Sequence, residues 1–155
     1  MFNFISTFLR KNLDYIFKYF DNLDLLSCIF SLGIAFFVEY FYKIIPCNLC
    51  YLERVFLYFY ILLFFCYKLN FIKSKIFNII QILNFAIGLI VSFYHLSLEQ
   101  GWIVSSCDFD FANLSNNVNC AIVRFWIFGM SLTSLIFIFY LCILFLSCLK
   151  LVKDN

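Results

Sequence analysis

Four long apolar runs, each bounded by polar or charged residues, constrain the fold of this chain more than any other feature. They cover about Leu25–Ile45, Tyr51–Leu69, Ile76–Leu98 and Phe125–Leu149. Each can cross the hydrocarbon core of a bilayer, which takes roughly 20 predominantly apolar residues. Backbone polar groups must be paired inside lipid, so we expect helices rather than strands. The sequence therefore predicts an all-α membrane protein, a bundle of four transmembrane helices.

The composition supports this class and excludes others. The chain is 65% hydrophobic and 13% charged, with a mean hydropathy of +0.98, and a soluble globule could not keep that much apolar surface out of water. Its 155 residues form a single membrane domain, residues 1–155, with no room for a separate soluble domain. The net charge of +2 is too small, and its basic residues too dispersed, to indicate a nucleic-acid partner.

The basic residues are distributed unevenly between the two ends of the expected bundle. One end carries Arg10, Lys11, Lys18, Lys68, Lys73, Lys75, Lys150 and Lys153, and the other carries Lys43, Arg54 and Arg124. Cytoplasmic loops of membrane proteins are rich in lysine and arginine. We therefore expect both termini and the loop at Asn70 to be cytoplasmic, and the loops at 46–50 and 99–124 to face outward.

The N-terminal segment, residues 1–23, is expected to lie along the cytoplasmic interface as an amphipathic helix. Its apolar residues from Phe4 to Phe20 recur at helical spacing, with charged residues between them. The segment lacks the order of a signal peptide, which has a basic region, a short apolar core and a small-residue cleavage site. We interpret it as an anchor.

The eight cysteines divide by their expected depth in the membrane. Four near the cytoplasmic ends of the spans are interpreted as packing residues, because cytoplasmic thiols stay reduced and a buried cysteine behaves as a small apolar side chain: Cys28, Cys66, Cys142 and Cys148. The other four belong to the outward loops or their junctions with helices: Cys47, Cys50, Cys107 and Cys120. Outward thiols meet an oxidising compartment, where an even number favours disulfides.

The sequence Pro46-Cys47-x-x-Cys50 combines a redox-capable pair with the only proline of the chain. Proline suits the first position of a helix, so we expect the second span to begin at Pro46. Both sulfurs would then lie in its first turns, where the helix dipole favours a thiolate. Arg54, four residues after Cys50, can add a positive charge on the same face, with Glu53 as its expected partner. A CxxC pair can equally be half of a zinc site.

Cys107 and Cys120 flank a polar stretch, Asp108 to Asn119, in the second outward loop. A disulfide closing this loop would contribute roughly 3 kcal/mol through loop entropy. The pair is either a structural staple or, beside a second exchangeable pair on the same face, a partner in thiol exchange.

Two further polar groups stand out because they lie in apolar spans. His95, the only histidine, is expected at the depth of Cys50 and Arg54, where it can donate a hydrogen bond to a bound carbonyl or pass a proton. It can also be a satisfied histidine at a helix end. Glu39 is costly inside the first span, and Lys43 at the next turn is its expected partner. The role of Glu39 is open.

Together these residues resemble the disulfide bond formation protein B family, the membrane quinone reductases that reoxidise an extracytoplasmic thioredoxin-fold oxidase. The resemblance spans all four helices. It rests on Pro46-Cys47-x-x-Cys50-x-x-Glu53-Arg54, on Tyr94-His95-x-x-Leu98-Glu99, and on Cys120-Ala121 with Gly129-Met130-Ser131. The chain departs from the family pattern at Thr133, where a proline is common, and in the stretch between Cys107 and Cys120, which is shorter than in the best-known members.

The resemblance implies a thiol:quinone oxidoreductase of the bacterial inner membrane that supports protein disulfide formation. Its partner would be a periplasmic DsbA-like dithiol oxidase, its cofactor a quinone, ubiquinone or menaquinone, and its site would hold no metal. By position, Cys107 would be attacked by the partner thiol, Cys120 would resolve or exchange, Cys47 would connect the two pairs through an interloop disulfide, Cys50 would donate electrons to the quinone, and Arg54, His95 and Glu53 would line the quinone site.

Three alternatives remain at this point. A vitamin K epoxide reductase-like enzyme would share four helices and a loop-to-quinone relay, but its CxxC should open the last span rather than the second. A noncatalytic membrane protein could bind a metal through the four outward cysteines in a tetrahedral site, although the charge of Arg54 disfavours a dication. A scaffold with structural disulfides would need neither Arg54 at that depth nor His95 opposite it.

Overall fold

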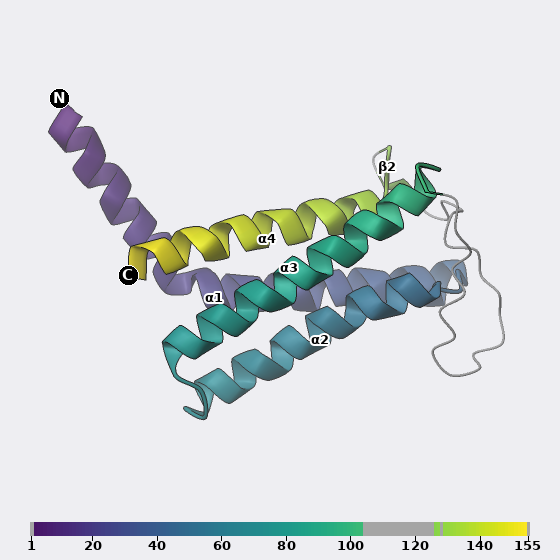
Figure 1. Cartoon of the computed structure of the whole chain (residues 1–155), viewed down its shortest axis with the longest axis horizontal. Coiled ribbons are helices and arrows are strands. Elements are labelled where there is room, and N and C mark those ends of the chain that lie inside the picture. The colour runs from purple at the N-terminus through teal and green to yellow at the C-terminus, as the bar shows by residue number, and fades with distance from the viewer. Residues whose placement is uncertain (1, 104–125, 128, 155) are drawn as a thin grey trace.

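The computed structural model of the chain describes residues 2–103, 126–127 and 129–154, and the side chains of residues 19–103 and 129–151. It contains four helices, α1 (Phe2–Tyr42), α2 (Asn48–Lys68), α3 (Ser74–Glu99) and α4 (Leu132–Asp154). Each includes a segment long and apolar enough to cross a membrane. Helix α3 packs between α2 and α4, and α1 packs along α2 (Figure 1). The predicted four-helix membrane bundle is confirmed.

Helix α1 differs from the prediction at both of its ends. It is one continuous helix from Phe2 to Tyr42 rather than an interfacial helix followed by a separate span. Figure 1 shows its N-terminal part leaving the bundle at an angle to the rest. Its interfacial location therefore stays a prediction. The helix ends at Tyr42, three residues before the predicted Ile45, because Lys43 adopts a left-handed backbone conformation with φ 51°.

The ends of α2 and α3 are closed by the same backbone motif. After α2, Phe71 N–H donates to the Cys66 carbonyl and Asn70 N–H to the Tyr67 carbonyl. After α3, the Trp102 N–H donates to the Ser97 carbonyl and the Gly101 N–H to the Leu98 carbonyl. In each case the residue that follows the cap has a positive φ, 62° at Asn70 and 73° at Gly101. These Schellman motifs pair the last carbonyls of each helix, and the one after α2 turns the chain into α3.

The start of α4 was predicted wrongly. The apolar run begins at Phe125, but the helix begins only at Leu132. Two short strands, β1 (Trp126–Ile127) and β2 (Met130–Ser131), pair antiparallel before it and turn at Gly129, whose φ is 80°. The Ser131 hydroxyl then accepts from the backbone N–H of Ser134 at 3.2 Å and caps the helix. An apolar run by itself does not distinguish a hairpin from the first turn of a helix.

The core of the bundle is aromatic. Tyr60, Phe77, Phe85 and Tyr140 are fully buried and join α2, α3 and α4. Gly88 lets α4 approach α3, because a Cβ atom at this position would lie 2.7 Å from the Tyr140 ring. The Tyr140 hydroxyl donates to the backbone carbonyl of a residue in α2, which satisfies its only O–H. Tyr140 is therefore held at its ring and at its hydroxyl.

Polar side chains link the helices at the end of the bundle that holds both chain ends. Lys150 of α4 pairs with Asp21 of α1 at 2.6 Å, and the Gln81 amide of α3 donates to the Asp24 carboxylate at 2.8 Å. The turn at Asn70 lies at this same end (Figure 1). Buried polar groups inside a bundle are costly unless they are paired, so these contacts fix how α1, α3 and α4 meet.

The four cysteines assigned to packing do not share one environment. Cys28 is fully buried in the aromatic core, as expected, and Cys66 is half-buried. Cys142 and Cys148 are exposed on α4, so a buried packing role was wrong for them. The rotation of α4 about its own axis is the reason, because it turns these two side chains away from the other helices and toward the surface that lipid would cover.

Candidate functional site

The CxxC pair lies at the N-terminus of α2. This end of the bundle is opposite the end that holds the Asp21–Lys150 ion pair. Helix α2 begins at Asn48, so Pro46 precedes the helix and is not its first residue as predicted. Cys47 is the N-cap. Its backbone is extended (φ −78°, ψ 169°), and its sulfur accepts a hydrogen bond from the backbone N–H of Cys50 at 3.4 Å. A sulfur that caps a helix lies at the positive end of the helix dipole.

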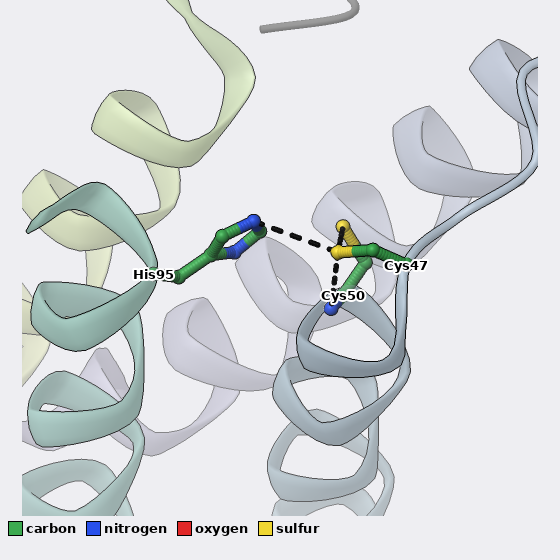
Figure 2. Close-up of side chains that lie close together, drawn as sticks. All are labelled: Cys47, Cys50 and His95. Carbon is green, nitrogen blue, oxygen red and sulfur yellow. Dashed lines mark hydrogen bonds between the residues drawn. The ribbon is translucent and has the colours of Figure 1, made fainter. Parts of the chain in front are cut away.

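Two sulfurs at the start of α2 and one ring nitrogen from α3 lie close together. The sulfurs of Cys47 and Cys50 lie 3.1 Å apart and share a hydrogen bond. Nε2 of His95, from α3, lies 3.5 Å from the Cys47 sulfur. Figure 2 shows the His95 ring reaching across from α3 toward the two sulfurs at the start of α2. His95 was predicted at the depth of Cys50 and Arg54, and the structure places it against Cys47.

The pKa of the Cys47 thiol is strongly lowered. It falls from 9.0 to about 4, mainly because the Cys50 thiol hydrogen bonds to the Cys47 sulfur. Burial of Cys47 opposes this change, and the hydrogen bond and positive charge of His95 add to it. Cys47 is thus a thiolate at neutral pH in the reduced protein, which makes it a nucleophile and a good leaving group in thiol exchange.

Glu53 orients His95. Its Oε1 lies 3.1 Å from His95 Nδ1, and both side chains are almost completely buried. When Nδ1–H donates to Glu53, the Nε2 lone pair faces Cys47 and can accept its proton. The second carboxylate oxygen, Oε2, is buried and has no hydrogen-bond partner among the described residues. Because of this arrangement the prediction that Glu53 pairs with Arg54 was wrong.

Arg54 forms its hydrogen bonds with residues of α1 rather than with Glu53. Its Nη1 donates to Glu39 Oε2 at 2.6 Å and its Nη2 to the Ala35 carbonyl at 3.4 Å, while its guanidinium lies over the rings of Phe36 and Tyr51. Glu39 is therefore the partner that an arginine at this depth requires. The prediction that Lys43 is the partner of Glu39 was wrong, because Lys43 lies past the end of α1.

An apolar pocket adjoins these groups and is lined by all four helices. Six of its lining residues carry functional polar atoms, Cys47, Cys50, Glu53, Arg54, His95 and Glu99. The remaining lining residues are mainly aliphatic: Ser31, Ala35, Val38, Ile44, Ile45, Pro46, Leu57, Leu132, Thr133 and Ile136. Pockets that bind small molecules commonly have this character, an apolar wall with a few converging polar groups.

Glu99 connects the pocket to the start of α4. Its Oε2 accepts a 2.6 Å hydrogen bond from the Ser131 hydroxyl, the same group that caps α4. In the sequence, Glu99 stood out only as part of the family motif. Its contact with Ser131 depends on the hairpin that precedes α4, which the apolar pattern did not reveal.

The second predicted pair, Cys107 and Cys120, lies outside the described residues. Their roles stay predictions. Three contacts among these residues were not predicted from the sequence, those of His95 with Cys47, of His95 with Glu53 and of Arg54 with Glu39. Depth along the spans gave a signal for His95, which was expected at the level of Cys50 and Arg54, but depth does not say which side chains face each other.

One of three comparisons with known proteins identifies the family of this chain. The family model described as disulfide bond formation protein DsbB matches residues 22–150, which include all four candidate spans almost completely. The comparison with curated proteins and the comparison with solved structures gave no significant match. The chain therefore belongs to the disulfide bond formation protein DsbB family, whose members are membrane oxidoreductases that form disulfide bonds.

Proposed function

We propose that this protein takes electrons from a periplasmic thioredoxin-fold dithiol oxidase, similar to DsbA, and passes them to a membrane quinone. The observation that supports this proposal most is that the Cys47–Cys50 pair borders an apolar pocket at one end of a membrane bundle. An acceptor in that pocket would be reached from the lipid rather than from water. The uneven distribution of lysine and arginine supports a cytoplasmic location for both termini and an outward, periplasmic location for the pair.

The residues around the pocket fit a quinone. The wall is apolar, as a quinone ring requires, and Arg54 brings a positive charge that suits an anionic reduced form. Glu53 Oε2 is a buried acceptor without a partner among the described groups, and a hydroxyl of a reduced quinone can satisfy it. When bound, the quinone would accept two electrons and two protons from the dithiol.

A second hollow supports access from the lipid. It adjoins the pocket through shared residues 44–46, and its wall includes the exposed rings of Phe36, Tyr40 and Tyr51. Arg54 lines the pocket and Glu39 lines the second hollow, so their ion pair lies between the two. We propose that the isoprenoid chain of the quinone leaves the pocket here, between the end of α1 and the start of α2.

The residues of this chain divide the work as follows. His95 Nε2 accepts the proton of the Cys47 thiol, and Glu53 holds the imidazole in the tautomer that can do so. With a quinone bound, Cys50 would give up the electron pair and end in a disulfide with Cys47, so that the pair loses two electrons and two protons. The family resemblance implies that the partner dithiol reduces the Cys107–Cys120 disulfide, and that these two thiols then reduce the Cys47–Cys50 disulfide and become a disulfide again.

The test is anaerobic reduction of added quinone by the purified protein with a reduced thioredoxin-fold dithiol, followed by absorbance. Both quinone classes should be tried. We expect turnover in the wild type, none in Cys50→Ala, and an unchanged rate in Cys142→Ala, because Cys142 is exposed on α4 and does not line the pocket. Full turnover in Cys50→Ala, or none in the wild type with either quinone, would contradict the proposal.

A further inference from the structure

The reduced CxxC pair and His95 also have the composition of a metal site. The ligand atoms of Cys47, Cys50 and His95 all lie within 4.8 Å of one another, and Figure 2 shows the three side chains converging from two helices. We propose that these three residues bind one Zn²⁺, or a similar thiophilic divalent cation, when the pair is reduced. This ligand set differs from the four outward cysteines weighed in the sequence analysis.

The distances suit tetrahedral zinc. Bond lengths of about 2.3 Å for Zn–S and 2.0–2.1 Å for Zn–N imply, at tetrahedral angles, separations of about 3.8 Å between two sulfurs and about 3.6 Å between sulfur and nitrogen. The Cys47 sulfur already lies 3.5 Å from His95 Nε2, and the two sulfurs are 3.1 Å apart. The geometry would be complete if the two sulfurs moved apart by about 0.7 Å.

Glu53 provides the support that zinc-binding histidines usually have. A histidine that binds a metal through one ring nitrogen commonly donates the other N–H to a carboxylate, which fixes the tautomer and orients the ring. Glu53 Oε1 lies 3.1 Å from His95 Nδ1, so Nε2 is left for the metal. Tyr140 in turn donates to the Glu53 backbone carbonyl at 2.9 Å. The imidazole is therefore held in place before any metal arrives.

The charges of the site allow a dication. Cys47 and Cys50 would bind as thiolates, with their thiol protons released to solvent, so the Zn²⁺ and its two sulfurs form a neutral unit that suits an apolar pocket. The positive charge of Arg54 counted against a dication when the sequence was considered by itself. In the structure, the Glu39 carboxylate lies 2.6 Å from Arg54 and offsets part of that charge.

The fourth position of the metal would face the pocket, since all three ligands line it. Three protein ligands and one open position are typical of zinc sites that exchange their metal or bind a further ligand. The sulfurs of a disulfide do not offer thiolate ligands, so only the reduced protein would bind. A bound ion would hold Cys47 and Cys50 apart and prevent their disulfide from forming, which makes the site inhibitory to the family activity.

The test uses the full chain, purified in detergent, with Cys107→Ser and Cys120→Ser introduced so that the second pair cannot bind metal. Co²⁺ is the probe, because tetrahedral cobalt with thiolate ligands has intense visible bands and a near-ultraviolet charge-transfer band. Zn²⁺ should then displace it. We expect one Co²⁺ per reduced chain and none in the oxidised chain. Because binding is measured without quinone or a dithiol partner, its failure is distinguishable from failure of the proposed function.

Variants assign the ligands. We expect Cys50→Ser to diminish the charge-transfer band, because one of the two thiolate ligands is lost. We expect His95→Gln to weaken binding at least tenfold, and Glu53→Gln to weaken it by about 10–100-fold, the usual loss when the partner of a metal-binding histidine is changed. Cys142→Ser is the matched control and should bind as well as the parent. No cobalt band in the reduced parent, equal bands in the oxidised parent, or undiminished binding in both His95→Gln and Glu53→Gln would overturn the proposal.

Discussion

Replacing Glu53 by Gln should slow the chemistry of Cys47 without unfolding the bundle. The substitution keeps the shape of the side chain and its backbone contact with Tyr140, but it removes the charge that faces His95 Nδ1 at 3.1 Å. The amide NH₂ can also donate to Nδ1, which would place the proton on Nε2 and leave no lone pair facing Cys47. Glu53 acts in this prediction as a positioning residue, through His95.

The size of the effect follows from the type of hydrogen bond that is lost. A hydrogen bond to a charged group contributes about 1.5–3 kcal/mol and a neutral one about 0.5–1.5 kcal/mol. The midpoints of these ranges differ by about 1.25 kcal/mol. This difference corresponds to a pKa change of about one unit in Cys47, and so to about a tenfold change in rate at a pH below that pKa. Little stability should be lost, because Glu53 Oε2 has no partner within the described part of the chain and gives up none on substitution.

The assay is the rate at which Cys47 in the reduced protein reacts with a small disulfide, with the modified peptide identified by mass, measured from about pH 3 to pH 8. We expect Glu53→Gln to shift the pH profile upward by about one unit. The variant should then react about tenfold more slowly below about pH 4 and at nearly the wild-type rate near neutral pH, where both proteins hold Cys47 as a thiolate. In a His95→Gln background the same change should have little further effect, because its target is absent. A wild-type pH profile in Glu53→Gln, or a full tenfold loss at low pH on top of His95→Gln, would refute the reasoning.

Three further predictions test the pocket, the thiolate and the packing. Arg54→Ala should raise the KM for quinone more than it slows exchange with the partner dithiol, and a variant slowed only in forming the mixed disulfide would contradict this role. In metal-free reduced protein, Cys47 should react with iodoacetamide at a nearly constant rate from pH 8 to pH 5 and lose reactivity as the pH falls through about 4, because its pKa is lowered and the thiolate persists above that value; a reactivity that instead rises toward pH 9 would show an ordinary thiol. Gly88→Ala should lower stability in detergent by about 1–3 kcal/mol, because its Cβ would lie 2.7 Å from the fully buried Tyr140 ring, whereas Gly33→Ala, with nothing within 4 Å, should not. Equal melting temperatures for the two glycine variants would argue against this packing.

Much of the fold was predictable from local properties of the chain. The apolar runs gave the number of spans, and the four helices confirm it. Their ends were less well predicted, because each depends on a local feature that hydropathy does not record. Helix α1 stops at the left-handed Lys43, α2 starts after the capping sulfur of Cys47, and α4 starts after a hairpin that turns at Gly129.

The candidate site was predictable as a set of residues but not as a set of contacts. The sequence by itself identified the membrane class, the CxxC pair at one end of the bundle, and Arg54, Glu53 and His95 near it, because length, hydropathy and motif spacing are properties of the chain. Only the tertiary structure decided that His95, 48 residues away, meets Cys47, and that Arg54 pairs with Glu39 rather than Glu53. Those pairings depend on how far each helix is rotated about its axis and on which helices pack together, and these are set by the whole core rather than by any single segment.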